Sequence, residues 1–384
     1  MGTVIMNRLC IYVTYNKENK IEEYMGYMLK ALREHVTALY VVCNYPKILD
    51  GVEYIEPYAD GIFYRENIGY DAGAYKDMLC SMLGWDKVYQ YDELILLNDS
   101  FFGPFYDMKG FFDLMQDEAC DFWGMTRNFS GKTKSGYFYK PHIQSYFLVF
   151  RRDVMHSTQF RDFWDNIVYP ETFEEAIINF EIRINECLND YGFVSKAFTD
   201  VWGITFEANM NPCVSASLEL IRDNNLPILK KKNLIIKNSF FPDVIKAVEF
   251  LEVNNLYPTD LIWNMMDKQF SINESTNNTE NCLELFYNKY NRIYFYGAGL
   301  CAKHLVLYFK HKGWKWEGFL VSDKTGQDLE SILFDDVYTN DDIGIIVSVF
   351  NQDVSKEIVQ HIGTKCRREQ LFIIYDCEAI RVYD

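Results

Sequence analysis

Apolar residues in the first part of the chain occur in two alternating patterns. Residues 8–14 and 37–43 are short apolar runs rich in β-branched and aromatic side chains, and another short run precedes Arg65. Between the first two runs, residues 21–32 carry apolar side chains at intervals of three and four, which places them on one stripe of a helix. Strand-like runs that alternate with amphipathic helices are typical of a doubly wound, mainly parallel α/β sheet.

The same patterns continue through the middle of the chain. Apolar runs at residues 120–126 and 143–151 predict two further strands. The polar segment 127–141 between them contains Gly and Ser, and we expect it to be a mobile loop over a site. Residues 171–190 have a helical apolar face, and Glu181 lies next to that face rather than opposite it. This helix therefore carries a carboxylate near its buried side.

A polar, Asn-rich stretch without periodicity, residues 271–281, is the best candidate for a linker. A chain of 384 residues is long enough for two domains, because one domain usually takes roughly 100–200 residues. We therefore predict a first domain at residues 1–270, with a helical part from about residue 243. This domain is followed by a linker at residues 271–285 and then by a small Rossmann-like α/β domain at residues 286–384.

The start of this second domain carries a nucleotide-binding pattern. A strand at residues 292–296 runs into the sequence GAGLCA and a helix, and the next strand ends in an acidic residue. Such a turn between a strand and a helix is the dinucleotide fingerprint in its expected setting, although tight packing of strand on helix also calls for glycine. The candidate nucleotide-binding residues are Gly297, Gly299, Ala302 and Asp323.

Two polar stretches of the first domain follow predicted strands. Asn67, Gly69, Asp71 and Gly73 alternate just after Arg65, and the buried strand 93–97 ends in Asn-Asp-Ser. In an open α/β sheet, ligands bind at the carboxyl ends of the strands, so both stretches point to one site, which we interpret as a nucleotide-sugar site. Taken singly, each stretch has a simpler explanation, an N-cap at Asp71 and an Asx-turn after the strand.

Sugar transfer from a nucleoside diphosphate needs compensation for the charge of the leaving diphosphate and a base for the acceptor hydroxyl. Arg65 is a candidate partner of the phosphates. Asp99 is placed to hold Mg²⁺ or Mn²⁺, but Leu97 stands where the first acid of the usual Asp-x-Asp pair would be, so metal dependence is open. Glu181 is the first candidate for the base and Asp99 the second. Glutamates of this kind are far more often ordinary helix residues.

The composition narrows the range of partners. The formal net charge of −17 disfavours binding to nucleic acid, and residues 230–232 are the only dense basic run. The ten cysteines lack CxxC and metal-type spacing, which is typical of reduced thiols in a cytosolic protein. No signal-peptide pattern and no run of 18 apolar residues is present. We therefore expect a cytoplasmic protein with at most peripheral contact at the inner face of the membrane.

Several motifs, in order, resemble the rhamnan synthesis protein F family, which itself resembles glycosyltransferases of the GT-A type. The resemblance spans roughly residues 6–232 and implies a GT-A-like doubly wound mixed sheet, followed by the small Rossmann-like domain. The motifs that carry it are RENIGYDAGAYKDML (65–79), ELILLNDSFFGPF (93–105), FWGMTRN (122–128), HIQSYFLVF (142–150) and the Phe180-Glu181 pair.

The resemblance implies an inverting transfer of a sugar, typically L-rhamnose from dTDP-rhamnose, to a growing cell-wall, capsular or O-antigen polysaccharide or its lipid-linked precursor. It places Glu181, where such enzymes often keep their base, and Asp99 in catalysis. It places His142, Gln144 and Ser145 on the acceptor side. Its donor-site motif falls on Arg65, Asn67, Gly69, Asp71 and Gly73, and we add their neighbours at the strand ends and on the following helix to the predicted donor site: Tyr12, Thr14, Tyr70, Lys76, Asn98 and Ser100.

Other functions stay open at this point. The donor could be UDP-galactofuranose, UDP-galactose or UDP-glucose, because discrimination between sugars depends on one or two hydrogen bonds. The chain could instead be an NAD(P)-dependent sugar-modifying enzyme, but no YxxxK pair follows the second-domain fingerprint. It could also be a non-catalytic scaffold that binds glycans. The second domain is a candidate surface for homo-oligomers or for other polysaccharide-assembly enzymes.

Overall fold

The computed structural model describes residues 6–199, 211–271, 281–323 and 330–377. The chain forms two compact units, residues 1–231 with 250–257, and residues 232–249 with 258–384. Part of the predicted linker, residues 272–280, lies outside the described residues. None of the described helices combines the length and the apolar character that crossing a membrane requires.

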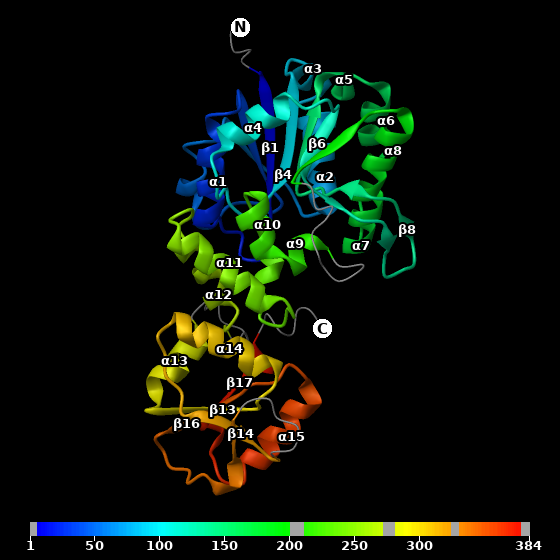
Figure 1. Ribbon diagram of the computed structural model, residues 1–384. Coiled ribbons are helices and arrows are strands. Elements are labelled where there is room, and N and C mark those ends of the chain that lie inside the picture. The colour runs from blue at the N-terminus through cyan, green and yellow to red at the C-terminus, as the bar shows by residue number, and fades with distance from the viewer. Residues whose placement is uncertain (1–5, 200–210, 272–280, 324–329, 378–384) are drawn as a thin grey trace. The chain divides into compact units, whose positions relative to one another are not determined.

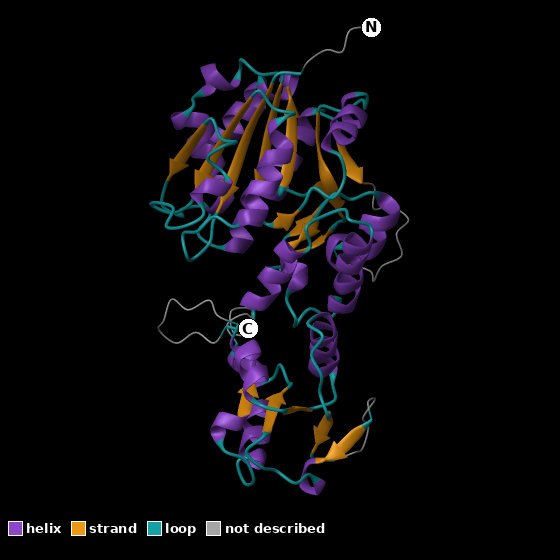
Figure 2. Ribbon diagram, turned by 90° about the vertical axis from the view of Figure 1, so that its left-hand side faces the viewer, coloured by secondary structure: helices purple, strands orange, loops and turns teal. Residues whose placement is uncertain are grey.

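The first unit contains a mixed sheet with strands in the order β11-β6-β10-β4-β1-β2-β3 (Figures 1 and 2). β1 pairs in parallel with β2 and β4, whereas β10 is antiparallel to both β4 and β6. The predicted doubly wound mixed α/β fold is confirmed. The strands are β1 Arg8–Thr14, β2 Ala38–Cys43, β3 Gly61–Tyr64, β4 Glu93–Asn98, β5 Phe101–Phe102, β6 Phe122–Asn128, β7 Gly131–Lys132, β8 Phe138–Tyr139, β9 His142–Ile143, β10 Phe147–Arg151, β11 Ser195–Thr199 and β12 Leu229–Lys230.

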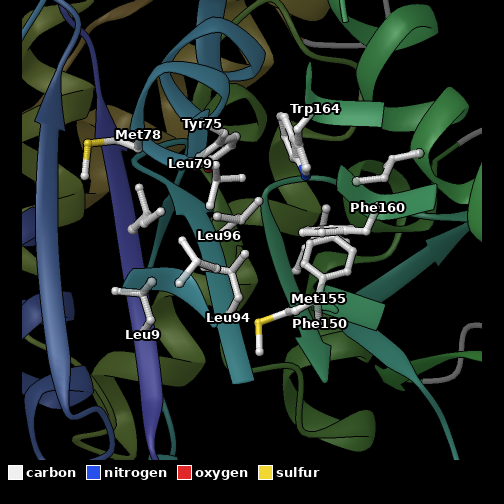
Figure 3. Packing of buried hydrophobic residues seen from close by; sticks show 14 of the residues in the cluster. Leu9, Tyr75, Met78, Leu79, Leu94, Leu96, Phe150, Met155, Phe160 and Trp164 are labelled. Carbon is white, nitrogen blue, oxygen red and sulfur yellow. The ribbon is translucent and has the colours of Figure 1, made fainter. Parts of the chain in front are cut away.

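Helices pack on the sheet because its strands are apolar on both faces. In β1, Leu9, Ile11 and Val13 belong to a core shared with α2, α6 and α8, which includes Trp164 (Figure 3). The intervening side chains of β1 are also buried, so they point to the opposite face of the sheet. The helices of the first unit are α1 Glu23–Arg33, α2 Tyr70–Asp77, α3 Trp85–Val88, α4 Met108–Gln116, α5 Arg152–Met155, α6 Thr158–Asn166, α7 Phe173–Ala176, α8 Arg183–Tyr191, α9 Pro212–Ser215 and α10 Ser217–Asn224. Helix α11, Phe241–Val253, begins in the second unit and ends in the first.

Two segments differ from the patterns expected of them. The helix predicted at residues 171–190 consists of α7, a π-helical turn at Ile177–Ile182 and α8. Glu181 lies on this wide turn, a kind of irregularity that is frequent at functional sites. The polar segment 127–141 contains the small antiparallel pair of β7 and β8, and its mobility stays a prediction.

The second unit has a five-stranded, fully parallel sheet in the order β15-β14-β13-β16-β17. The predicted strand, glycine turn and helix are present, with Gly297 at a positive φ of 107° between β13 and α14. This is the small Rossmann-like sheet that the sequence predicts. Its elements are α12 Asp260–Lys268, α13 Cys282–Lys289, β13 Arg292–Tyr296, α14 Leu300–His311, β14 Gly318–Val321, β15 Ser331–Leu333, β16 Ile343–Val347, α15 Gln352–Ile362 and β17 Leu371–Ile373.

Candidate functional site

Polar residues from two adjacent parallel strands meet at the carboxyl edge of the first sheet. The register pairs Val13 of β1 with Asn98 of β4, which brings Thr14 beside the residue after β4. The Thr14 hydroxyl donates to Asp99 Oδ2 at 3.0 Å, and the Tyr24 hydroxyl donates to the Asp99 carbonyl oxygen at 3.0 Å. The Asp99 side chain retains only 12% exposure. Thr14 therefore holds the carboxylate of Asp99, and Tyr24 of α1 holds its backbone.

Asp71 joins the same edge from the first turn of α2. Asn98 Nδ2 donates to Asp71 Oδ2 at 2.5 Å, so the two polar stretches of the sequence are in direct contact. Burial raises the pKa of Asp71 to about 6, the charge of Asp99 adds to the rise, and the Asn98 hydrogen bond opposes it. Gly69, with φ of 77°, is the N-cap residue of α2. The simpler explanation of Asp71 as an N-cap is therefore wrong.

The basic residues of the first motif are engaged within the protein. Arg65 donates from Nε to Asp77 Oδ2 at 2.8 Å and from its two terminal nitrogens to Asn44 Oδ1 and the Ile68 carbonyl, each at 2.7 Å. These bonds brace the loop that leads into α2. Lys76 Nζ likewise donates to the Ile167 carbonyl oxygen at 2.7 Å. The binding of phosphate by Arg65 and the place of Lys76 in the donor site stay predictions.

The other donor-site residues of this loop lie on its surface and in its backbone. Asn67 is exposed, and Tyr70 has a positive φ of 54° with its ring edge-on to Phe173 at 6.5 Å. A Cβ on Gly73 would lie 2.2 Å from the Ile68 carbonyl oxygen. Close packing of the loop on α2 thus requires a glycine at position 73, independently of any ligand.

Gly73→Ala should therefore lower the free energy of unfolding by about 1–3 kcal/mol, because the loop backbone has to move to accommodate a methyl group. Urea unfolding followed by circular dichroism measures the change. Gly110→Ala is the matched control, since a Cβ on this helix glycine meets no described atom within 4 Å. That control should stabilise the protein by up to about 1 kcal/mol through helix propensity. A wild-type midpoint for Gly73→Ala would contradict the packing argument.

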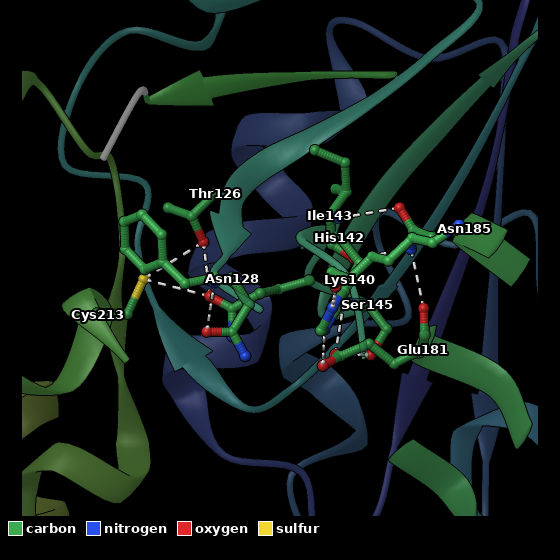
Figure 4. Close-up of polar contacts among 11 residues, drawn as sticks. Thr126, Asn128, Lys140, His142, Ile143, Ser145, Glu181, Asn185 and Cys213 are labelled. Atoms are coloured by element: carbon green, nitrogen blue, oxygen red, sulfur yellow. Dashed lines mark hydrogen bonds and ion pairs between the residues drawn. The ribbon is translucent and has the colours of Figure 1, made fainter. Parts of the chain in front are cut away.

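Two of the predicted acceptor residues contact Glu181 (Figure 4). The backbone nitrogen and the hydroxyl of Ser145 donate to Glu181 Oε2 at 2.8 and 2.6 Å. His142 Nε2 lies 3.2 Å from Glu181 Oε1, and its Nδ1 donates to the Lys140 carbonyl oxygen at 3.0 Å. Both ring nitrogens face acceptors, so this geometry favours the doubly protonated imidazolium. The result is a largely buried ion pair that is tied to β9 and to the loop between β9 and β10.

These contacts set the charge of Glu181. Burial acts to raise its pKa, but the hydrogen bond and positive charge of His142 and the two bonds from Ser145 outweigh burial and lower the pKa to about 2. For His142, burial acts to lower the pKa, and the hydrogen bond and charge of Glu181 raise it above the ordinary value. Glu181 is therefore ionised across the physiological range.

Gln144, the third predicted acceptor residue, belongs to a neighbouring buried network. Thr126 Oγ1 donates to Gln144 Oε1 at 2.8 Å and lies 2.7 Å from the Tyr146 hydroxyl. Sequence reasoning missed Thr126 and Tyr146, which stand within apolar strand patterns and carry no separate signal there.

Tyr12, a predicted donor-site residue, is 1% exposed, and burial raises the pKa of its hydroxyl well above the ordinary value.

Lysines from outside the resembling motifs also reach the strand edge. Lys230 Nζ donates to Ser100 Oγ at 3.0 Å, and Lys231 Nζ lies 3.6 Å from Asp99 Oδ2. In the sequence they stand out only as part of a basic run. Within residues 6–199, 211–271, 281–323 and 330–377, no group of three or more His, Cys, Asp or Glu side chains is arranged to hold a metal ion. Asp99, with a bound diphosphate, could still hold Mg²⁺, which takes one or two carboxylates plus phosphate oxygens.

The second unit contains a separate cavity of about 430 Å³. Ser348 Oγ donates to the carbonyl oxygens of Tyr296 and Gly297, which supports the glycine turn, and Asp323 is exposed. None of the four predicted nucleotide-binding residues, all of them described, lines the cavity, and their role stays a prediction. The cavity is lined by Lys237, Phe350, Asn351, Gln352, Asp353 and Tyr375.

Comparison with known proteins gives one family and several distant relatives. The family model described as rhamnan synthesis protein F matches residues 39–376. Virulence protein VirA of Vibrio anguillarum is 25% identical over 218 residues, which cover 50% of this chain and 67% of VirA. Uncharacterized protein y4gN of Sinorhizobium fredii is 27% identical over 139 residues, which cover 36% of this chain and 35% of y4gN.

Two solved structures are similar at a low level. 4-Diphosphocytidyl-2C-methyl-D-erythritol synthase from Anaerococcus prevotii aligns with a TM-score of 0.29 and 10% identity. The alignment covers 50% of this chain and 88% of the synthase chain. Core-mannan synthase A from Aspergillus fumigatus, in an Mn/GDP form, has a TM-score of 0.28 and 11% identity, covering 47% of this chain and 71% of its own. TM-scores this low carry no argument about the site.

Proposed function

The chain belongs to the rhamnan synthesis protein F family, and from this premise we propose that it transfers L-rhamnose from dTDP-rhamnose to a growing bacterial surface polysaccharide. The membership confirms the resemblance found in the sequence and makes the chain a glycosyltransferase. The family suggests the choice of L-rhamnose, and the observation that supports a donor site is the meeting of Thr14, Asp71, Asn98 and Asp99 at the carboxyl edge of the parallel strands. Ligands of open α/β sheets bind at such an edge.

On the donor side, we assign the diphosphate to the surroundings of Asp99 and Ser100. Asp99 is the residue that would hold Mg²⁺ or Mn²⁺, which would neutralise charge on the diphosphate. Asp71 titrates near pH 6, so its negative charge is reduced when the pH falls below that value. The loop that Arg65 braces forms the wall on which the nucleoside lies.

On the acceptor side, we assign Glu181 as the base in an inverting transfer. Its pKa of about 2 keeps it ionised, but three donors make it a weak proton acceptor in the free protein. An acceptor hydroxyl that takes the place of the Ser145 hydroxyl would remove one of these donors and raise the proton affinity of Glu181. The acceptor is a polysaccharide or a lipid-linked oligosaccharide.

A thermal-shift panel tests the donor. We expect dTDP and dTDP-rhamnose to raise the unfolding midpoint, because a ligand at 100 times its Kd stabilises the folded state by about 2.7 kcal/mol. UDP, UDP-galactofuranose, UDP-galactose, UDP-glucose and NAD(P) are compared at the same concentration, each with and without Mg²⁺ or Mn²⁺. A shift of the midpoint with UDP species alone would show that the donor is a UDP-sugar rather than dTDP-rhamnose. A shift with NAD(P) alone would overturn the proposal.

A further inference from the structure

Two consecutive lysines are held at the carboxyl edge of the first sheet by a strand pairing between distant parts of the chain. β12 pairs antiparallel with β5, and the register sets Lys230 opposite Phe101. The Lys231 backbone nitrogen donates to the Ser100 carbonyl oxygen at 2.9 Å. The backbone therefore places both side chains next to Asp99 and Ser100.

The two ammonium groups are enclosed but retain polar partners. Lys230 is 8% exposed; its Nζ donates to Ser100 Oγ and lies 3.6 Å from the centre of the Tyr146 ring. Lys231 Nζ donates to the Tyr24 hydroxyl at 2.7 Å and lies 3.6 Å from Asp99 Oδ2, with 25% of its side chain exposed. Burial of a charged amine is unfavourable unless it gains interactions in return. Two ammonium groups held next to each other in this way indicate a site that binds negatively charged groups.

The balance of charge at this edge points to an anionic ligand. Asp71 and Asp99 both lie here, and the lysines contribute to lowering the pKa of Asp71. The chain as a whole has a formal charge of −17, so a diphosphate gains nothing from the general field of the protein. A diphosphate brought to Asp99 would meet repulsion unless a local cation offsets it. Lys230 and Lys231 are cations in contact with the residues of the proposed donor site.

We propose that Lys230 and Lys231 bind the diphosphate of the donor, an inference that rests on the proposed transferase function. The Lys231 side chain is partly exposed, and its ammonium group would exchange the contact with Asp99 for one with a phosphate oxygen. During transfer, the bond from the anomeric carbon to the phosphate oxygen breaks, and its electron pair leaves with the diphosphate. The acceptor oxygen bonds to the anomeric carbon, and its proton passes to the base. The ammonium groups stabilise the charge that grows on the leaving oxygen.

This role differs from that of a simple counterion. If Lys231 only neutralised Asp99, its removal would weaken diphosphate binding through repulsion by Asp99, and that loss would disappear in an Asp99→Asn background. If it binds phosphate, its removal weakens diphosphate binding in both backgrounds and spares nucleosides. Measuring dTDP and thymidine in the two backgrounds therefore separates the two roles.

Titration calorimetry with dTDP and with thymidine, in EDTA and in Mg²⁺, makes the comparison in the wild-type and the Asp99→Asn backgrounds. Lys231→Ala and Lys231→Gln should weaken the binding of dTDP by roughly 10–100-fold, as expected for loss of a hydrogen bond between charged groups. The affinity for thymidine should stay unchanged. Lys231→Arg should keep most of the affinity. Lys232→Ala is the matched control, because this neighbouring lysine is exposed, and it should bind dTDP like the wild type.

The outcomes distinguish this inference from the proposed function. Wild-type affinity for dTDP in folded Lys231→Ala and Lys231→Gln would overturn the inference and leave the transferase proposal standing. An equal loss of thymidine binding would also overturn it, because a phosphate contact does not act on the base. A wild-type protein that binds neither dTDP nor UDP, with or without Mg²⁺, would sink the proposed function and the inference with it.

Discussion

Asp99→Asn should lower kcat/KM for dTDP-rhamnose by about 10²-fold, because a divalent metal held by this carboxylate would offset the charge that grows on the leaving diphosphate. The substitution keeps the shape of the side chain but removes its charge. That charge is the partner of Lys231 and the candidate ligand of a divalent metal. The Thr14 hydroxyl can still donate to the amide oxygen, so the fold should survive. Release of dTDP in the presence of a surface-polysaccharide fraction measures the rate.

Asp86→Asn is the control for Asp99→Asn, because Asp86 is an exposed aspartate on α3 with the same change of charge. It should retain wild-type rates. Repeating both measurements over a range of Mg²⁺ and Mn²⁺ concentrations tests whether Asp99 acts through a metal. A rate for Asp99→Asn within twofold of wild type at every metal concentration would remove Asp99 from the donor site.

Glu181→Gln should lower kcat by about 10²–10⁴-fold, the range for losing a general base, with little change in the affinity for dTDP. The amide cannot accept the acceptor proton, and it also loses the charge that pairs with His142. We therefore expect a cost in stability of about 1–3 kcal/mol as well, since buried donors lose their acceptor. The rate of dTDP release at saturating donor, with circular dichroism of the variant, separates the two effects.

Glu175→Gln controls for the loss of a negative charge from the same helical segment, because Glu175 is exposed on α7. A Glu181→Gln protein that is folded and turns over near the wild-type rate would show that Glu181 only positions His142 and Ser145. The sign of the pH effect follows from the lowered pKa. Ionised Glu181 stabilises the fold above its ordinary pKa of 4.5, and this contribution is lost as the pH falls toward 2.

The strand edge could be predicted from the sequence because its signals are local. Polar residues directly after apolar runs mark strand ends, and parallel order follows from the alternation of strands with helices. Thr14 and Asp99 illustrate this, since each follows its own strand and the register of β1 and β4 then brings them together. The direction of each long side chain had no such signal. Arg65 faces Asp77 and Asn44 because of how α2 packs on the loop, which composition and spacing do not specify.

Contacts between distant segments were beyond sequence reasoning for a similar reason. Lys230 reaches Ser100 only because β12 pairs with β5, two strands of two residues each that are far apart in the chain. Strands this short leave no periodic pattern. The π-helical turn at Ile177–Ile182 also lacks a signal, because the apolar face continues through it and only the hydrogen bonds change. The family resemblance nevertheless assigned His142 and Ser145 to the acceptor side and Glu181 to the base, three residues that lie in contact.

The π-helical turn that carries Glu181 affects how this segment can change in evolution and in protein engineering. A π-turn contains one residue more than the α-turn it replaces, so it behaves as a single-residue insertion that a deletion could undo. Deleting one of its residues would restore regular α-helix with α7 and α8 still in register, but would change the direction of the side chains on the turn itself. The helix would become more regular while Glu181 lost its alignment with Ser145. At this position a regular helix and an aligned Glu181 therefore require different numbers of residues.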